Sequence, residues 1–447
     1  MQHKLIVVLF TFFMASQLVA QTNGNSPYSR FGIGDLTNDN FMHTRMMGSI
    51  GTSYLDGYHI NIVNPASYAS LRATAFDIGL DAKRSTLSSG DESNTTWSGN
   101  LQYISLAFPL GNPLNEILDQ KKRNYDLGMS FTLMTNSTVG YNIAVQDSLA
   151  GIGNLERLYG GEGGSYKFLW GNAIKYKDFS FGVNLGYLFG NIRYEQNVTF
   201  FDLPDAYQNL FSSQYNLNGF LFDVGTIYSK VLNKKQLQDK TERVPKLFSL
   251  GLRVKSATNF NTNLTTAQFG VQTINGTNQF IDTAFIASDL KGSGKLPLEW
   301  GFGASYYGGE KFMIGVDLSA TNWSSYKNDA DPTASENPLS DTYSVSFGGY
   351  YRPDYKSYNR YFKRVYYRYG FYYRSDPRSV GGDQLDEYGL TLGLGLPFIY
   401  QRKISHANLG LEFGRRGSGS PIAESFFRIS LGFTFNDDEW FIKKKYN

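Results

Sequence analysis

The sequence contains no cysteine. This absence excludes disulfide bonds, thiolate metal sites and a cysteine nucleophile. It also excludes a bacterial lipoprotein anchor, because that anchor is attached to an N-terminal cysteine. Chemistry that depends on sulfhydryl groups is therefore ruled out for this chain.

Charged residues and long apolar runs are also scarce. Asp, Glu, Lys and Arg make up 18% of the chain, against roughly 25% in soluble domains. The net charge of +3 is too small to indicate nucleic-acid binding, so we expect no nucleic-acid partner. After the N-terminus no stretch approaches the roughly 18 uninterrupted apolar residues of a transmembrane helix, so helical spans are not expected.

Signatures of catalysis and of metal binding are missing as well. The chain has four histidines, and His43 and His59 have no acidic or histidine neighbour at metal-ligand spacing apart from Asp56. No GxSxG elbow, HExxH helix, Walker loop or EF-hand is present. We therefore expect no enzymatic activity, no catalytic residue, no metal site and no cofactor.

The N-terminus has the pattern of a secretory signal peptide. Lys4 precedes an apolar stretch from Leu5 to Met14, and Ala15–Ala20 follows, with Leu18 larger than is usual three residues before a cleavage site. The apolar stretch is too short to cross a bilayer as a helix. We expect residues 1–20 to be the signal peptide and to be removed on export.

Alternation of apolar and polar residues recurs along the rest of the chain. It is clear in Phe312–Thr321, Tyr388–Leu396 and Phe427–Asn436. Successive side chains of a strand point to opposite faces, so each segment has one apolar and one polar face. About ten residues suffice for a tilted strand to cross a bilayer. Together with 32 Tyr, 34 Phe and 47 Gly, this pattern indicates an all-β protein of the outer membrane.

Fourteen such segments lie between residues 72 and 436, which predicts a 14-stranded antiparallel transmembrane β-barrel. The connections mostly alternate between long polar loops, such as Ser137–Gly164 and Ser256–Lys295, and tight turns, such as Tyr176–Asp178. Long external loops and short periplasmic turns are typical of such barrels, and this order places both termini in the periplasm of a bacterial cell. The alternative is a soluble propeller or sandwich, for which no blade-length repeat or domain linker is present.

Charged residues on the polar parity of the strands are candidates for the barrel lumen. Arg368 and Arg374 alternate with the aromatic residues around them and are expected to point inward. Glu299, Asp317 and Glu412 are the acidic residues with which they are expected to pair.

Two patches of sequence resemble a known family. Asn61–Ala69, just before the first strand, is similar to the Asn-Pro-Ala segment of FadL-type outer-membrane transporters for hydrophobic compounds. Leu296–Gly303 and Ile314–Ser324 are similar to two paired late strands of that family. The resemblance implies a 14-stranded barrel plugged by an N-terminal hatch, and it places Asn64, Pro65 and Ala66 in the hatch motif.

With this resemblance, the expected organisation is a hatch over residues 21–71, a barrel over 72–436 and a basic periplasmic tail over 437–447. The tail and Ser26–Asp35 are departures from the fatty-acid transporters. These departures put the transported substrate in question more than the fold.

Two functions follow from the sequence. One is uptake of hydrophobic, fatty-acid-like molecules through the plugged barrel, with outer-membrane lipid and a hydrophobic ligand as partners. The other is a non-transporting scaffold, a subunit of an outer-membrane complex such as a secretion or assembly machine, with outer-membrane or periplasmic protein partners.

Some FadL-like barrels resemble the shuttle component of type IX secretion, which holds secreted proteins. A general porin is a third option, disfavoured if residues 21–71 fill the barrel. A continuous apolar cavity would support transport, whereas a filled, charged lumen would support the scaffold.

Overall fold

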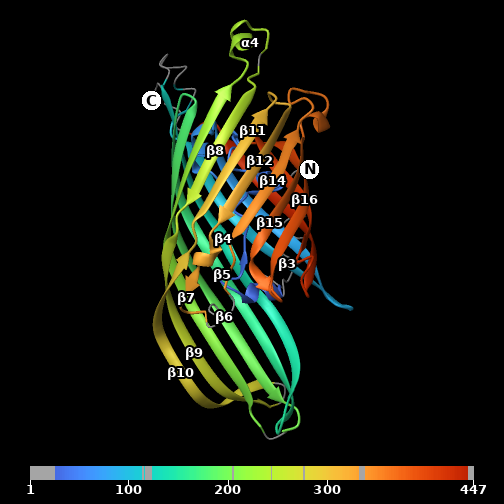
Figure 1. The fold of residues 1–447 in the computed structure, drawn as a ribbon. Helices are drawn as coiled ribbons and strands as arrows, with labels where there is room; N and C mark the ends of the chain where they lie inside the picture. The colour runs from blue at the N-terminus through green and yellow to red at the C-terminus, as the bar shows by residue number, and fades with distance from the viewer. Residues whose placement is uncertain are drawn as a thin grey trace.

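The computed structural model describes residues 26–112, 115, 123–203, 206–242, 244–274, 277–331 and 338–440. The expected signal peptide and residues 441–447 of the expected basic tail lie outside these residues. The described chain forms an antiparallel β-barrel that is longer on one side than on the other (Figure 1). None of its helices is long and apolar enough to cross a membrane.

The barrel wall contains fourteen antiparallel strands, as predicted. Two of them are interrupted for two residues, so that β8 continues as β9 and β10 continues as β11. The last strand pairs with the first, from Asp437 opposite Thr74 to Ala423 opposite Ser88, which closes the barrel. The strands are β2 (Thr74–Ser89), β3 (Glu92–Pro109), β4 (Tyr125–Leu149), β5 (Gly153–Tyr176), β6 (Phe179–Phe200), β7 (Gln208–Val231), β8 (Leu247–Lys255), β9 (Thr258–Ile274), β10 (Thr277–Leu296), β11 (Glu299–Tyr307), β12 (Phe312–Thr321), β14 (Thr342–Tyr351), β15 (Tyr366–Val380), β16 (Asp383–Tyr400), β17 (Lys403–Arg416) and β18 (Ala423–Asp437).

The alternating sequence places apolar side chains on the outside of the wall. In β6, Phe179, Phe181 and Leu185 are exposed, whereas Ser180 and Asn184 are buried toward the interior. An apolar outer surface on a closed barrel is the arrangement that a bilayer requires. The predicted two-faced strands are thus confirmed.

The long polar connections predicted at Ser137–Gly164 and Ser256–Lys295 are wrong, because both are paired strands. The β4–β5 hairpin remains paired as far as Leu149 and Gly153, and β9–β10 as far as Ile274 and Thr277. We call the projecting parts of β4, β5, β6, β7, β9 and β10 the extension, which lies at the bottom of Figure 1. In β9 the outward residues include Asn259, Asn261 and Asn263, so this part of the extension lacks the apolar outer face that would reveal a membrane strand in the sequence.

The residues before β2, which we call the N-terminal segment (residues 26–73), lie against the inner face of the wall. They form η1 (Pro27–Arg30), β1 (Asp35–Leu36), α2 (Met42–Arg45) and η2 (Pro65–Ser70). The η2 helix packs on β4 to β7, whereas α2 packs on β16 to β18. The apolar side chains of the segment are buried between these strands; they include Phe41, Met42, Met46, Met47, Ile50, Tyr54, Ile60 and Tyr68.

Short elements complete the chain. α4 (Lys234–Gln238) lies in the β7–β8 turn, η4 (Tyr361–Lys363) precedes β15, and η3 (Trp323–Ser325) leads into β13 (Lys327–Asn328). β13 pairs with β10 at Gly294 and Lys295, at the base of the extension.

Candidate functional site

The space between the N-terminal segment and the wall is the candidate functional site. It contains a cavity of about 300 Å³. Most side chains that line the cavity are polar or charged; the charged ones include Asp35, Asp39, Arg45, Asp81, Lys83, Arg253, Lys255, Glu299, Asp317, Arg374, Asp376, Arg378, Glu387, Arg416 and Arg428. Such a lining favours water and ions over apolar solutes.

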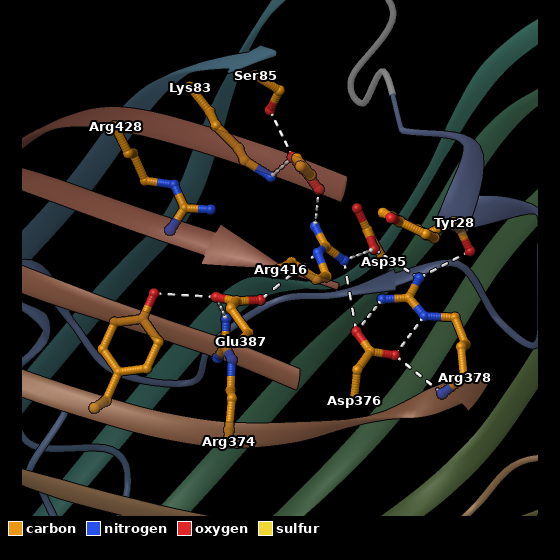
Figure 2. Close-up of polar contacts among 12 residues, drawn as sticks. Tyr28, Asp35, Lys83, Ser85, Arg374, Asp376, Arg378, Glu387, Arg416 and Arg428 are labelled. Carbon is orange, nitrogen blue, oxygen red and sulfur yellow. Dashed lines mark hydrogen bonds and ion pairs between the residues drawn. The ribbon is translucent and has the colours of Figure 1, made fainter. Parts of the chain in front are cut away.

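One charged network joins the N-terminal segment to the C-terminal strands (Figure 2). The Asp35 carboxylate accepts hydrogen bonds from the guanidinium groups of Arg378 (2.7 Å) and Arg416 (2.8 Å). Arg378 also donates to the carboxylate of Asp376 at 2.6 Å and to the backbone oxygen of Tyr28 at 2.9 Å. The network thus clamps both η1 and β1 to β15 and β17.

The network continues through Arg416 to the last strand. Its Nη2 lies 2.8 Å from the carboxylate of Glu424, a side chain without exposed surface. Lys83 and Ser85 of β2 donate to the same carboxylate at 2.6 and 2.7 Å. These contacts bridge β17, β18 and β2 across the closure of the barrel (Figure 2).

A ring of four charges lies next to this network. Arg45 of α2 is 3.1 Å from Asp81 and 3.6 Å from Glu412. Arg428 is 2.8 Å from Glu412 and 3.4 Å from Asp81. Each cation therefore contacts both anions, which reduces the cost of burying all four.

A second anchor of the N-terminal segment lies on another part of the wall. The Asp39 carboxylate accepts hydrogen bonds from Lys167 of β5 at 2.5 Å and from Lys255 of β8 at 2.6 Å. Lys255 also donates to Glu299 at 3.0 Å, and Arg253 lies 2.6 Å from Glu299.

Electrostatics keep both aspartates ionised. Burial raises the pKa of Asp35, but the guanidinium groups of Arg416 and Arg378 lower it by more, so it lies well below its usual range. For Asp39, burial likewise raises the pKa, and the ammonium groups of Lys167 and Lys255 outweigh that effect and hold it well below its usual range. Both anchors are therefore ion pairs at neutral pH.

The Asn-Pro-Ala motif is buried at the start of η2. The Asn64 side-chain oxygen accepts a hydrogen bond from the Ala66 backbone at 3.1 Å, which caps the helix. Its amide nitrogen donates to backbone oxygens of the N-terminal segment and of two wall strands, namely Thr52 (2.7 Å), Thr226 (3.2 Å) and Leu252 (3.3 Å). Asn64 thus joins η2 to β7 and β8.

Two glycines of the wall let the motif approach this closely. A Cβ at Gly182 would lie 2.3 Å from the Pro65 carbonyl carbon and 2.4 Å from the Ala66 nitrogen. A Cβ at Gly225 would lie 2.0 Å from the Asn64 side-chain oxygen. The backbone of η2 therefore rests directly on β6 and β7.

Of the five predicted lumen charges, Arg368 and Asp317 make contacts other than the expected ion pairs. Arg368 donates to the Asn408 side chain at 2.6 Å. Asp317 accepts hydrogen bonds from the backbone nitrogens of Gly51 and Thr52, both at 2.7 Å. Asp317 is thus a backbone anchor for the N-terminal segment.

The expected pairing of Arg368 and Arg374 with Glu299, Asp317 or Glu412 is wrong. Arg374 pairs with Glu387 at 2.6 Å, whereas Glu299 and Glu412 pair with the cations named above. The acidic partners depend on strand register and on the path of the N-terminal segment, neither of which the sequence alone supplies.

Three histidines, spaced far apart in the sequence, stack inside the barrel. The ring centroids of His43 and His59 are 4.9 Å apart, and those of His59 and His406 are 4.6 Å apart. The Asp56 carboxylate lies 3.1 Å from Nδ1 of His59. Burial, followed by the neighbouring imidazole of His59, lowers the pKa of His43 well below its ordinary value. In the described part of the chain, no group of three or more His, Asp or Glu side chains is arranged to hold a metal ion.

The principal anchors were not predicted from the sequence. Asp35 and Asp39 lie in an irregular segment without a repeating pattern. Arg416 and Glu424 share the inward parity of Glu412 and Arg428 on their strands, and this parity was the signal that could have revealed them.

Solved structures share this fold. The chain matches a monoaromatic hydrocarbon channel, CymD (14% identity, TM-score 0.52, covering 91% of this chain and 99% of that chain). It matches the toluene transporters TbuX of Ralstonia pickettii (13%, 0.52, 89% and 99%) and TodX of Pseudomonas putida (14%, 0.54, 90% and 99%). These proteins are named as channels and transporters rather than enzymes, and their likeness confirms the predicted FadL-type outer-membrane barrel fold.

The curated proteins contain no match. A family model described as BamG matches residues 1–447, which is the whole chain. The protein therefore belongs to the BamG family.

Proposed function

We propose that this protein is a non-transporting outer-membrane barrel that serves as a subunit of a protein complex, with residues 21–71 as a permanent plug. The observation that carries the proposal is the charged interior. Asp35 and Asp39 tie the N-terminal segment to separate parts of the wall, and the cavity beside them is lined mainly by polar and charged groups.

The energetics of this interior oppose the passage of apolar molecules. A hydrophobic solute gains free energy from apolar surface, which the cavity lining offers sparingly. Opening the plug would separate buried ion pairs such as Asp35–Arg416 and Asp39–Lys167. Lys167 would lose the carboxylate with which it pairs, and leaving one buried charge unpaired costs about 3–5 kcal/mol, so the closed state is strongly preferred.

The same proposal includes an orientation. We place the C-terminal end of the chain, α4 and the barrel end around them in the periplasm, and the extension outside the cell. Ser26, whose backbone nitrogen donates to Gly140 of β4 at 2.9 Å, lies toward the extension, so the N-terminal segment enters the lumen from that side and not from the periplasmic end expected from the sequence. In Figure 1 the C-terminal end of the chain and α4 lie at one end and the extension at the other. The apolar outer rows of the wall, such as Phe181 and Leu185, then contact outer-membrane lipid.

A second candidate is uptake of apolar small molecules. It is supported by the fold shared with CymD, TbuX and TodX, whose names state that they pass monoaromatic hydrocarbons or toluene. This candidate requires the N-terminal segment to move, because its side chains occupy the path.

Purification from outer membranes in mild detergent separates the two candidates. The preparation is analysed for co-purifying proteins and for lipid-like molecules in the same sample. The scaffold predicts protein partners in fixed stoichiometry and no stoichiometric apolar ligand. Recovery of the barrel alone with a bound apolar molecule would favour uptake instead.

A further inference from the structure

The outer edge of the extension is formed by β10, which is open over most of its length. β10 pairs with β9 along one side. Among the described residues, its other side pairs only with β13, at Gly294 and Lys295. From Thr277 to Gly292 this edge therefore presents backbone groups that a further strand can bind.

Large apolar side chains are concentrated on this open edge. Phe280 is 64% exposed, Phe285 52% and Ile286 56%; Ile281 and Leu290 are exposed as well. Register shifts after Phe280, Thr283 and Ala287 bring successive residues to different faces. The strand is therefore apolar and exposed on both faces, which is unusual for the free edge of a protein that stands alone.

Lipid is not the covering for this surface. The neighbouring strand β9 presents Asn261, Asn263 and Thr265 outward near the level of Leu290, and β7 presents Gln214 and Asn216. A row of amides and hydroxyls at this height would be buried in hydrocarbon at high cost. The apolar edge is thus surrounded by the polar residues of β7 and β9, and an apolar patch with a polar rim is typical of a protein-binding surface.

One strand of the chain already pairs with the base of this edge. β13 is a short antiparallel strand added at the base of the same edge, and Asp329 continues its bonding with a backbone donation to Ser293 at 2.9 Å. An occupant that continued this ladder would be an extended strand. The bulges disfavour a second copy, because bulged edges resist regular edge-to-edge pairing.

The charged residues of the open edge indicate the charge that a binding partner would carry. From Thr277 to Gly292 the open edge contains two acidic residues, Asp282 and Asp289, and one basic residue, Lys291, so its formal charge is negative. Among the described residues, neither aspartate lies in an ion pair, and Asp289 accepts a hydrogen bond from the Asn263 side chain at 3.2 Å. An apolar strand with basic flanking residues complements this edge.

We propose that β10, from Phe280 to Leu290, binds an apolar strand with basic flanks from another protein subunit, by addition to the open edge. This inference rests on the proposed scaffold function and names the surface that the scaffold uses. It assigns the extension to partner binding, separately from the plugged lumen.

The first test places a photoreactive benzoylphenylalanine at position 285 in intact cells. The matched control carries the same group at position 263, an exposed site on β9. Crosslinking from 285 to a basic-flanked strand of a different protein, with none from 263, is the expected result. A crosslink to a second copy, to glycolipid or back to the same chain overturns the proposal.

The second test compares Phe285→Asp/Ile286→Asp with Gln214→Asp/Asn218→Asp, which adds the same charge to exposed polar positions of β7. The first pair is expected to reduce recovery of the crosslinked partner by at least about tenfold. The control Gln214→Asp/Asn218→Asp lies on β7 and does not contact β10, so it should leave recovery unchanged. Heat-modifiable migration on denaturing gels reports whether each barrel has folded. If Phe285→Asp/Ile286→Asp recovers the partner fully, the proposal that β10 is the binding surface is refuted, but the scaffold function is not. If the unmodified protein recovers no partner at all, the scaffold function itself is refuted.

Discussion

Asp35 and Asp39 lie four residues apart in the chain and bind cations about half-way round the barrel from each other. Asp35 contacts Arg378 of β15 and Arg416 of β17. Asp39 contacts Lys167 of β5 and Lys255 of β8. The short stretch between them thus acts as a strut across the lumen.

Removing this strut should destabilise the protein strongly. Asp35→Asn combined with Asp39→Asn leaves Lys167 without an anion among the described residues, whereas Arg378, Arg416 and Lys255 each keep one other carboxylate. One unpaired buried charge is enough to lower the free energy of unfolding by about 3–5 kcal/mol. Asp147→Asn is the matched control, because Asp147 lies 3.5 Å from Arg157 at an exposed site and such pairs contribute about 0–1 kcal/mol. Urea unfolding in lipid vesicles measures both. Equal effects of the double variant and the control would contradict the strut.

The pH dependence should separate these aspartates from His43. A carboxyl whose pKa is lowered on folding stabilises above its unfolded pKa of about 4 and loses that contribution as the pH falls through the folded value. A histidine whose pKa is lowered on folding, such as His43, destabilises as the pH falls below about 6.5, because the unfolded chain binds the proton more tightly.

Between pH 7 and pH 5, therefore, stability should decrease because of His43 and not because of Asp35 or Asp39. We expect a limiting slope of about 1.4 kcal/mol per pH unit for one proton, and a flatter profile for His43→Phe, which keeps an aromatic ring in the stack. Urea midpoints across this range provide the test. A His43→Phe profile that parallels the wild-type profile would disprove the assignment.

Crowding at Gly182 should displace the N-terminal segment. Gly182→Ala places a methyl group 2.3 Å from the Pro65 carbonyl carbon, and overpacking of this kind costs about 1–3 kcal/mol. Gly160→Ala is the control, since nothing lies within 4 Å of its added Cβ. Limited proteolysis of folded barrels should cleave the N-terminal segment faster in the first variant only. Equal cleavage would show that the motif does not rest on β6.

Substitutions at Asn64 should divide its capping role from its bridging role. Asn64→Ala removes the cap of η2 and the donor to Thr52, Thr226 and Leu252, with an expected loss of about 2–3 kcal/mol. Asn64→Asp retains an acceptor for Ala66 but lacks the amide donor, so it should recover only the cap, about 1 kcal/mol. Urea unfolding compares the two. Stability of Asn64→Ala within 0.5 kcal/mol of wild type, about the size of a neutral surface change, would argue against both roles.

The strands of the wall were predictable because each has one face in lipid and one in the interior. The extension was not, because strands such as β9 present Asn259, Asn261 and Asn263 to solvent and therefore read as polar loops. The β10 bulges further disrupt the period of two.

For the candidate site, parity predicted that Arg374 and Glu412 would point inward, and both are charged groups of the interior. Their partners were not predictable, since Glu387 and Arg428 reach them through strand register. Asp35 and Asp39 act through the path of an irregular segment, for which local sequence gives no direction.

The most direct test of the central claim is to map where an apolar photoreactive probe labels the purified barrel. An aryl diazirine of the size of toluene is added, irradiated and located by peptide mass spectrometry, with the toluene transporter TodX as the positive control. A closed, charged interior predicts labelling of outward residues such as Phe181 and Leu185 and none at Asp317 or Thr391. Labelling of these interior residues that excess toluene suppresses would contradict the account.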